Sequence, residues 1–323
     1  MIPRIDISFS LKNQWAFWFG QAYAPAKGEY LLNHARSGIV MALRTALPKG
    51  GRVGVVAYNC HTVANAVVES SCTPVFIDVT EDLHMDLLHL AGVQLDAIVV
   101  TNLFGINNDI EAISKAQPNA IIIVDNAHGY GVPAEGDFTV YSINQGKFPA
   151  LGEGGILVVN NIQYQPSIQQ QYAALPSYNR CQELKLFMIM LAKAWMHIPW
   201  IYGLLTHRLK AHRGKVACRE AVVLKRMAKG VSRMYQHALP FIGNQIALQK
   251  TNAQAIAKAL VAKKLADRVW YGDNAFMLIA RSDNPEQLNQ YFAKNGVESA
   301  THFARTIEWA KQFSYTEGQC PMT

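Results

Sequence analysis

The sequence is poor in three features that mark common classes of protein. It has only five cysteines in 323 residues, Cys60, Cys72, Cys181, Cys218 and Cys320, and no two are close together. Disulfide frameworks and zinc sites use paired cysteines, so this pattern indicates a reducing compartment. No uninterrupted apolar run reaches the roughly 18 to 20 residues of a membrane-spanning helix. The first residues lack an apolar stretch after a basic one, so we expect no secretory signal and a cytoplasmic location.

Acidic residues are also scarce in one part of the chain. The net charge is +7, and between residues 208 and 229 only Glu220 is acidic among several lysines and arginines. This segment predicts a solvated basic face, an anion-facing surface or a membrane-proximal patch. It follows an apolar, tryptophan-rich stretch, residues 184–205, that contains Lys193 and Pro199. That stretch predicts either two buried helices bent at the proline, internal or in a dimer interface, or an element that attaches to an anionic membrane surface without spanning it.

Strand-like and helix-like segments alternate through the first half of the chain. β-branched and apolar runs bounded by turn residues predict strands, and the segments between them have the period of helices. This alternation predicts an α/β fold with a mostly parallel central sheet and helices on both faces. The expected strands are residues 53–57, 73–78, 97–101, 120–124, 138–143 and 156–159.

The length and the pattern predict two domains. Residues 1–238 would form a large domain, with a helical apolar and basic insertion at about residues 165–230. Residues 239–323 would form a small α+β domain. Its expected elements are a helix over 239–265, a strand over 274–280, a helix over 285–295 and a strand over 297–303. The aromatic-rich residues 1–35 are expected to be irregular and packed on the core or on a partner.

Residues 141–155 organise the chain, because a strand there leads into Lys147 and then into a glycine-rich turn. Glycines permit tight turns and close approach of the backbone to a bound group. A lysine in such a turn is either a solvated loop charge or a ligand-binding residue. A phosphate-cradling P-loop is excluded, since Tyr141 stands where its first glycine belongs and Phe148 where it needs serine or threonine.

An acid precedes this lysine by 22 positions (147 minus 125). Asp125 follows the apolar run 120–124, so it ends a strand. Carboxyl ends of parallel strands meet at the crevice where open α/β sheets bind ligands, so Asp125 and Lys147 should face each other. Pyridoxal phosphate chemistry needs such a pair. The lysine forms a Schiff base with the cofactor, and the carboxylate keeps the pyridinium nitrogen protonated.

Three motifs of the middle third stand out together. They are Val124-Asp-Asn-Ala-His128-Gly, Ser142 five residues before Lys147, and Gly152-Glu-Gly-Gly155. With them the chain resembles the DegT/DnrJ/EryC1/StrS family of sugar aminotransferases. The likeness extends from about Ser37 to Pro321 and is most specific in the middle third. It implies the aspartate aminotransferase superfold, fold type I, among enzymes that use pyridoxal 5′-phosphate.

The resemblance implies roles for four residues of the middle third. Lys147 would carry the cofactor as its Schiff base and act as the catalytic base. Asp125 would face the ring nitrogen. His128 stands where the family commonly has a glutamine near the ring hydroxyl, and imidazole can make the same hydrogen bond. Ser142 matches a serine that contacts the cofactor phosphate.

Two earlier segments complete the expected cofactor site. Ser37 is a plausible N-cap of a helix, and the resemblance gives Ser37 and Gly38 the turn whose backbone amides hold the cofactor phosphate. The third residue of that turn, Ile39, lacks the hydroxyl that the family has there. Either Tyr58 or Cys60 would cover the cofactor ring, where an aromatic residue is usual in the family. The remaining histidines show no spacing that predicts a metal site.

The resemblance implies an aminotransferase that converts a nucleotide-linked keto sugar to an amino sugar, with glutamate as amino donor, in surface polysaccharide or related glycan biosynthesis. It implies a homodimer at the inner face of the membrane or in the cytoplasm, with no nucleic-acid partner. Relatives continue beyond the last residue of this sequence, so we expect a truncated small domain. The alternative is a catalytically degenerate relative that acts as a binding or scaffold protein.

Overall fold

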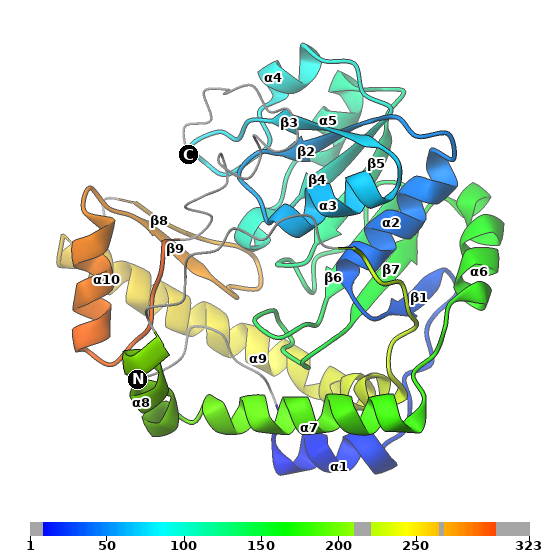
Figure 1. The fold of residues 1–323 in the computed structure, drawn as a ribbon. Coiled ribbons are helices and arrows are strands. Elements are labelled where there is room, and N and C mark those ends of the chain that lie inside the picture. Colours follow the sequence, from blue (N-terminus) through cyan, green and yellow to red (C-terminus); the bar gives the residue numbers. More distant parts are fainter. Residues whose placement is uncertain (1–8, 210–220, 265–267, 302–323) are drawn as a thin grey trace.

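A seven-stranded sheet forms the centre of the computed structural model, which describes residues 9–209, 221–264 and 268–301 (Figure 1). The strand order is β1-β7-β6-β5-β4-β2-β3. All neighbouring strands are parallel except the pairs that involve β7. The strands are β1 (Glu29–Leu32), β2 (Arg52–Val56), β3 (Thr73–Ile77), β4 (Ala97–Thr101), β5 (Ile121–Asn126), β6 (Phe138–Ser142) and β7 (Gly155–Val159). The predicted fold class is confirmed, and the six strands predicted for this sheet lie within one residue or two of the observed ones. The strand β1 was not predicted, and the strand predicted over 274–280 begins four residues before β9 (Leu278–Arg281).

Helices cover both faces of the sheet because successive strand residues point to opposite sides. Val99 and Ile123 pack into a core with α2 (Ala35–Ala46), α3 (His61–Glu69) and α6 (Gln165–Ala174). Ile98 and Ile122 pack into a second core with α4 (Leu87–Ala91) and α5 (Ile110–Ala116). Continuous apolar runs are therefore the expected composition of these buried parallel strands. Two short 3₁₀ turns, η1 (Leu103–Gly105) and η2 (Ile162–Tyr164), follow β4 and β7.

A helical layer closes one end of the molecule (Figure 1). It contains α1 (Leu11–Phe19), α7 (Arg180–Met196), α8 (Pro199–Leu209) and α9 (Lys229–Ala262). The prediction of two helices separated at Pro199 is confirmed, and the proline opens α8. The prediction that both helices are buried is wrong for α7, whose buried residues are only Glu183, Leu186 and Met190. The N-terminal segment is not wholly irregular either, since α1 forms there with Ser10 as its N-cap.

The C-terminal unit contains a two-stranded antiparallel sheet and one helix beside α9. Its elements are β8 (Arg268–Tyr271), β9 (Leu278–Arg281) and α10 (Pro285–Lys294). The strand predicted over 297–303 is wrong in its described part, where Val297 makes only an isolated bridge. The predicted domain division at residue 239 falls inside α9, which begins at Lys229, so that division stays a prediction. None of the helices in the described ranges is long and apolar enough to cross a membrane.

The start of α2 lies directly on β7, and this contact fixes where the helix begins. A Cβ on Gly155 would lie 2.2 Å from the backbone nitrogen of Ala35 and from the carbonyl carbon of His34. Gly155 pairs with Leu32 of β1 and with Ser142 of β6. Only a glycine therefore allows the sheet and the helix to approach this closely.

Gly155→Ala should lower the free energy of unfolding by about 1–3 kcal/mol, the usual cost of overpacking, because backbone atoms cannot move aside as a side chain can. Gly243→Ala is the matched control. Nothing lies within 4 Å of a Cβ at Gly243, in the middle of α9. Alanine there should stabilise the helix by up to about 1 kcal/mol. Urea unfolding measures both variants, and equal midpoints would contradict the assigned contact.

Candidate active site

Four residues singled out in the sequence meet in one cavity at the carboxyl end of β4, β5 and β6. Lys147, Asp125, His128 and Ser142 all line it, together with Cys60 at the start of α3. Asp125 is the second-last residue of β5, and Ser142 is the last residue of β6. The prediction that these residues meet at the carboxyl ends of parallel strands agrees with this arrangement. The other lining residues are His34, Ala35, Arg36, Ile39, Asn59, Thr62, Val63, Thr101, Ala127 and Asn144.

The amine of Lys147 lies 2.6 Å from Nε2 of His128, which is the closest polar contact of the cavity. The backbone N–H of Phe104 donates to Nδ1 of the same ring at 3.1 Å. Since Nδ1 accepts, the hydrogen-bond network assigns the imidazole proton to Nε2, which then donates to Lys147. An amine that accepts a hydrogen bond has a free lone pair, so Lys147 is neutral in this arrangement.

Burial favours the same protonation state. The low-polarity surroundings lower the pKa of Lys147 from its ordinary value, while the charges of Cys60 and Asp125 act in the opposite direction and are outweighed. A neutral lysine amine is a nucleophile and a proton acceptor, which an ammonium group is not.

Asp125 is held in place by a short chain of hydrogen bonds. Its carboxylate accepts the N–H of Ala127 at 3.0 Å and the hydroxyl of Thr101 at 3.4 Å. The amide of Asn59 donates to that hydroxyl at 2.8 Å. Asp125 is only 3% exposed, and burial raises the pKa of its carboxyl, against the opposing effects of these bonds and of Lys147. A cation placed beside it would therefore be bound in a site that water does not screen.

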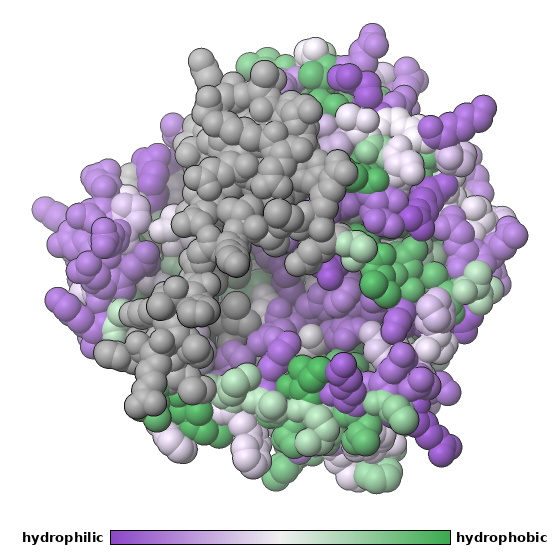
Figure 2. Space-filling view, in the orientation of Figure 1, coloured by the Kyte–Doolittle hydropathy of each residue, from purple (hydrophilic) through white to green (hydrophobic). Residues whose placement is uncertain are grey.

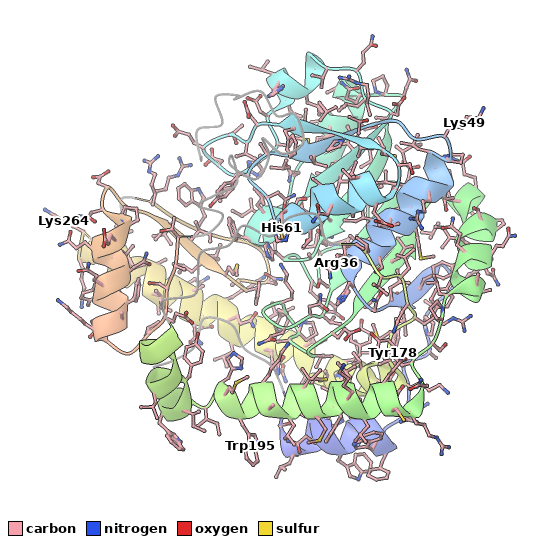
Figure 3. The ribbon with its side chains drawn as sticks, viewed as in Figure 1. Arg36, Lys49, His61, Tyr178, Trp195 and Lys264 are labelled. Atoms are coloured by element: carbon pink, nitrogen blue, oxygen red, sulfur yellow. The ribbon has the colours of Figure 1, made fainter. Side chains whose placement is uncertain are left out.

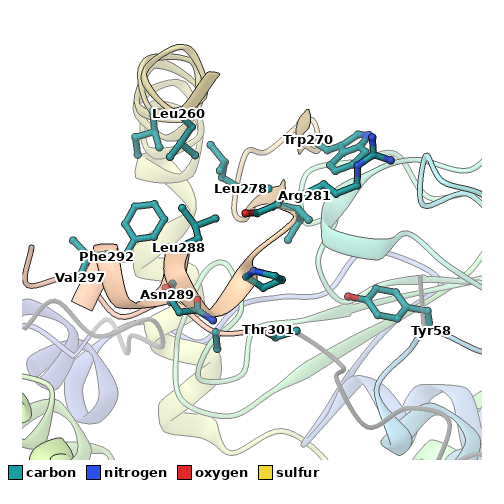
Figure 4. A pocket seen from close by; sticks show the side chains of 17 residues that line it. Tyr58, Leu260, Trp270, Leu278, Arg281, Leu288, Asn289, Phe292, Val297 and Thr301 are labelled. Atoms are coloured by element: carbon teal, nitrogen blue, oxygen red, sulfur yellow. Dashed lines mark hydrogen bonds between the residues drawn. The ribbon is translucent and has the colours of Figure 1, made fainter. Parts of the chain in front are cut away.

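Cys60, and not Tyr58, faces the Lys147 cavity. Tyr58 lines a separate cavity of about 410 Å³ that Leu260, Trp270 and other residues of α9 and the C-terminal unit enclose (Figure 4). Burial raises the pKa of the Cys60 thiol, but hydrogen bonds with His61 and Thr62, together with the charge of Lys147, outweigh it and lower the pKa to about 7. The thiol thus occupies the position where the resemblance placed a ring-covering side chain.

The prediction for Ser37 and Gly38 is wrong about where the helix begins. His34 is the N-cap of α2, and Ser37 lies within the first turn. The hydroxyl of Ser37 donates to the amide oxygen of Asn33 at 2.8 Å, so it is used inside the protein. A Cβ on Gly38 would lie 2.8 Å from Val140, so Gly38 packs on the sheet. Neither residue lines the cavity, and Ile39 is a buried residue of the same helix.

Sequence reasoning missed Arg36, which lies in the first turn of α2 near the centre of Figure 3 and lines the cavity. Its Nε is buried and has no hydrogen-bond partner among the described residues. A cation in the first turn opposes the helix dipole, and this was a signal in the sequence for an anion at that end. Burial and the charge of Arg36 lower the pKa of neighbouring His34 to about 4, so His34 is neutral.

Two further residues that sequence reasoning missed contact His128 without lining the cavity. Phe104 has a φ of 55°, an unusual backbone conformation for this residue type, and its ring stacks on His128 at 5.6 Å. Asn274 of the C-terminal unit donates its amide to the backbone oxygens of His128 at 2.8 Å and of Tyr130 at 3.2 Å. Asn144, to which no role was given, accepts the N–H of Gly154 at 2.7 Å and so shapes the glycine turn.

Comparison with known proteins agrees with this geometry. The chain is 26% identical over 154 residues to the spore coat polysaccharide biosynthesis protein SpsC of Bacillus subtilis, and the match covers 43% of this chain and 40% of SpsC. The chain therefore matches less than half the length of that relative.

Two solved structures share the fold over nearly the whole chain. The sugar aminotransferase CalS13 from Micromonospora echinospora has a TM-score of 0.70 at 16% identity, with 100% of this chain and 91% of that chain covered. Spr1654 from Streptococcus pneumoniae, described as a sugar aminotransferase and solved in its PMP form, has a TM-score of 0.72 at 15% identity, with 100% and 91% covered. Residues 22–177, which include every strand of the sheet and Lys147, match the sequence profile of the DegT/DnrJ/EryC1/StrS aminotransferase family. Through this segment, just under half of its length, the chain is similar to the DegT/DnrJ/EryC1/StrS aminotransferase family.

Proposed function

We propose that this protein is a pyridoxal-phosphate-dependent aminotransferase that converts a nucleotide-linked keto sugar to an amino sugar, with glutamate as the amino donor. The observation that carries the proposal is the neutral Lys147 amine, 2.6 Å from His128, in one cavity with the buried carboxylate of Asp125. Surface polysaccharide or related glycan biosynthesis is the setting we infer, because SpsC is named for spore coat polysaccharide biosynthesis. We also infer a homodimer, from the resemblance to the family.

The residues of the cavity fit the cofactor at both ends. Arg36 brings a guanidinium whose buried Nε has no partner within the described part of the chain, at the N-terminus of a helix of 12 residues. A phosphate group would satisfy both the orphaned donor and the helix dipole. At the other end, Asp125 would hold the ring nitrogen and Lys147 the reactive carbon. Ser142, which also lines the cavity, would add a hydroxyl to the phosphate contacts.

The chain's own residues supply proton transfer and charge. Pyridoxal phosphate, when bound, supplies an aldehyde that combines with amines and a ring that withdraws electrons from the adjacent carbon. Lys147, once its amine is free, can accept a proton at Nζ from the substrate carbon and return it on the other side of the reaction. His128 holds that amine in position through its Nε2 proton. Asp125 favours the positive charge on the ring nitrogen, because opposite charges in a buried site attract strongly.

A second candidate is a binding protein that has lost activity. Cys60 favours it, because a thiol lines the cavity where the resemblance expects an aromatic ring. Ile39 favours it too, because it lines the same cavity and lacks the hydroxyl that the resemblance expects at that position. The two candidates differ in whether Lys147 binds the cofactor and in whether amino groups are transferred.

Lys147 should be the lysine that pyridoxal phosphate modifies. Its pKa lies below the ordinary 10.5, so the neutral amine that attacks an aldehyde persists at lower pH than in a lysine in water. Borohydride reduction near neutral pH, followed by peptide mapping, should place the label on the peptide of Lys147. Lys147→Arg, which keeps a long basic side chain but cannot form the Schiff base, is the control. A label spread over many lysines would remove the cofactor assignment.

Arg36→Met should weaken the binding of pyridoxal phosphate by about tenfold or more, the loss of a charged hydrogen bond of about 1.5–3 kcal/mol. It should leave the binding of pyridoxal, which has no phosphate, unchanged. Absorbance titration measures both affinities without any turnover. Arg44→Met, at the exposed C-terminal end of the same helix, is the matched control. Equal losses for the two ligands would show that Arg36 does not bind the phosphate.

Asp125→Asn should preserve the fold and the bound cofactor but reduce transamination by about 100-fold or more, since each pKa unit of lost ring protonation corresponds to about 1.36 kcal/mol. The amide keeps the shape of the side chain and its contact with Thr101, but it has no charge to hold the ring nitrogen protonated. Absorbance gives the cofactor content, and amino transfer from glutamate gives the rate. A variant with the parental rate would make Asp125 a structural residue and the proposed function wrong.

A further inference from the structure

Large apolar side chains stand in solvent along α1. Leu11, Trp15 and Phe19 are 82%, 60% and 71% exposed. They are four residues apart, so they form one line along the helix. The rings of Trp15 and Phe19 contact each other at 6.1 Å. The opposite side of α1 packs on the protein, since Ala16 and Phe17 are fully buried against α9 and its neighbours.

A second line of exposed apolar side chains runs along α7. Leu184, Met188 and Trp195 are 52%, 53% and 65% exposed. Their spacings of four and seven residues put them on one face. Leu186 and Met190 occupy the opposite face and are buried. The helix α7 therefore has apolar residues on two faces and buries only one of them. Such an arrangement is unusual in a protein that functions entirely in water.

The two lines belong to one surface because α1 and α7 pack side by side. The ring of Phe187 on α7 lies 5.3 Å from that of Phe17 and 5.4 Å from that of Trp18 on α1. Figure 1 places both helices at the lower edge of the molecule, and hydrophobic surface gathers there in Figure 2. Trp195 lies at the same edge in Figure 3. We call this surface the basal face, made of Leu11, Trp15, Phe19, Leu184, Met188 and Trp195.

The charges on these two helices have one sign. Lys12, Arg180 and Lys185 are exposed on them. The only acid in either helix is Glu183, which is buried and accepts the backbone N–H of Lys229 at 2.8 Å. The basal face therefore presents apolar and positive groups and no exposed carboxylate.

We propose that the basal face docks on the surface of an anionic phospholipid bilayer, with α1 and α7 lying in the plane of the headgroups. Apolar residues with tryptophan on one side and lysine or arginine around them are the composition of interfacial helices. Tryptophan is favoured at headgroup depth, and lysines there attract anionic lipid. The helices lie on the membrane and do not cross it, in keeping with the absence of any spanning helix in the described part of the chain.

A second copy of the chain fits this surface less well. A symmetric dimer through the basal face would bring Lys12, Arg180 and Lys185 against the same residues of the other copy. No exposed acid is available on either helix to compensate, so like charges would face each other at the interface. The bilayer supplies the opposite charge that the second copy lacks. This docking does not depend on the proposed function, because none of the basal residues lines the Lys147 cavity.

The full chain should float with vesicles that contain phosphatidylglycerol and stay behind with vesicles of phosphatidylcholine alone. Binding should fall as salt is raised, since salt screens the attraction. The double variant Trp15→Ser with Trp195→Ser should lose about tenfold or more of the binding, and Lys185→Glu should lower it too. Leu88→Ser is the control, because Leu88 is 88% exposed on α4, far from the basal face. All the replaced side chains are exposed, and circular dichroism checks that each variant is folded.

Three results would overturn the proposal. The first is a parent chain that does not float with anionic vesicles at low salt. The second is equal binding by the parent and by both basal variants, or an equal loss in Leu88→Ser, which would mean general adhesion. The third combines two observations: the parent does not bind vesicles, and the mass of the double variant, measured by sedimentation, falls from that of a dimer to that of a monomer. The basal face would then join two copies of the chain.

Discussion

The contact between Lys147 and His128 is the interaction on which the rest of the site depends. It is short, and it gives a neutral amine only because Nδ1 of the same ring is already occupied by the backbone N–H of Phe104. Phe104 belongs to the turn directly after β4. A backbone N–H after one strand thus affects the protonation of a lysine after another, through a single imidazole. The reactivity of Lys147 is a property of the assembled sheet.

Burial disfavours the charged form of the ionisable groups at both ends of the cavity. It lowers the pKa of Lys147 and raises the pKa of Asp125, so both groups are shifted toward their neutral forms. Arg36 also lines the cavity, and its buried Nε lacks a partner among the described residues. The ligand that we propose, with an anionic group at one end and a cationic ring nitrogen at the other, would satisfy all three residues.

The strands and the pair Asp125 and Lys147 could be predicted because they depend on local sequence. Buried parallel strands are continuous apolar runs, and residues 97–101 were predicted with the bounds that β4 has. The start of α2 could not be predicted, since Ser37 is a good N-cap by type while Gly155 and Val140 place the helix elsewhere. Asn274 could not be predicted either, because its contact with His128 spans 146 residues. For α7 the sequence left both a buried helix and a surface element open, because an apolar sequence is the same whether water or protein covers it.

The contact between Asn274 and His128 also bears on the order in which the parts of the site form during translation. Every strand of the sheet and Lys147 are translated before residue 160, and they can pair as soon as they leave the ribosome. The loop of His128 receives its last two hydrogen bonds only when Asn274 arrives, more than a hundred residues later. A nascent chain thus carries a formed sheet with an incompletely fixed loop until Asn274 has been made. The hydrogen bonds that fix this loop can form only after α9 and β8 have been translated.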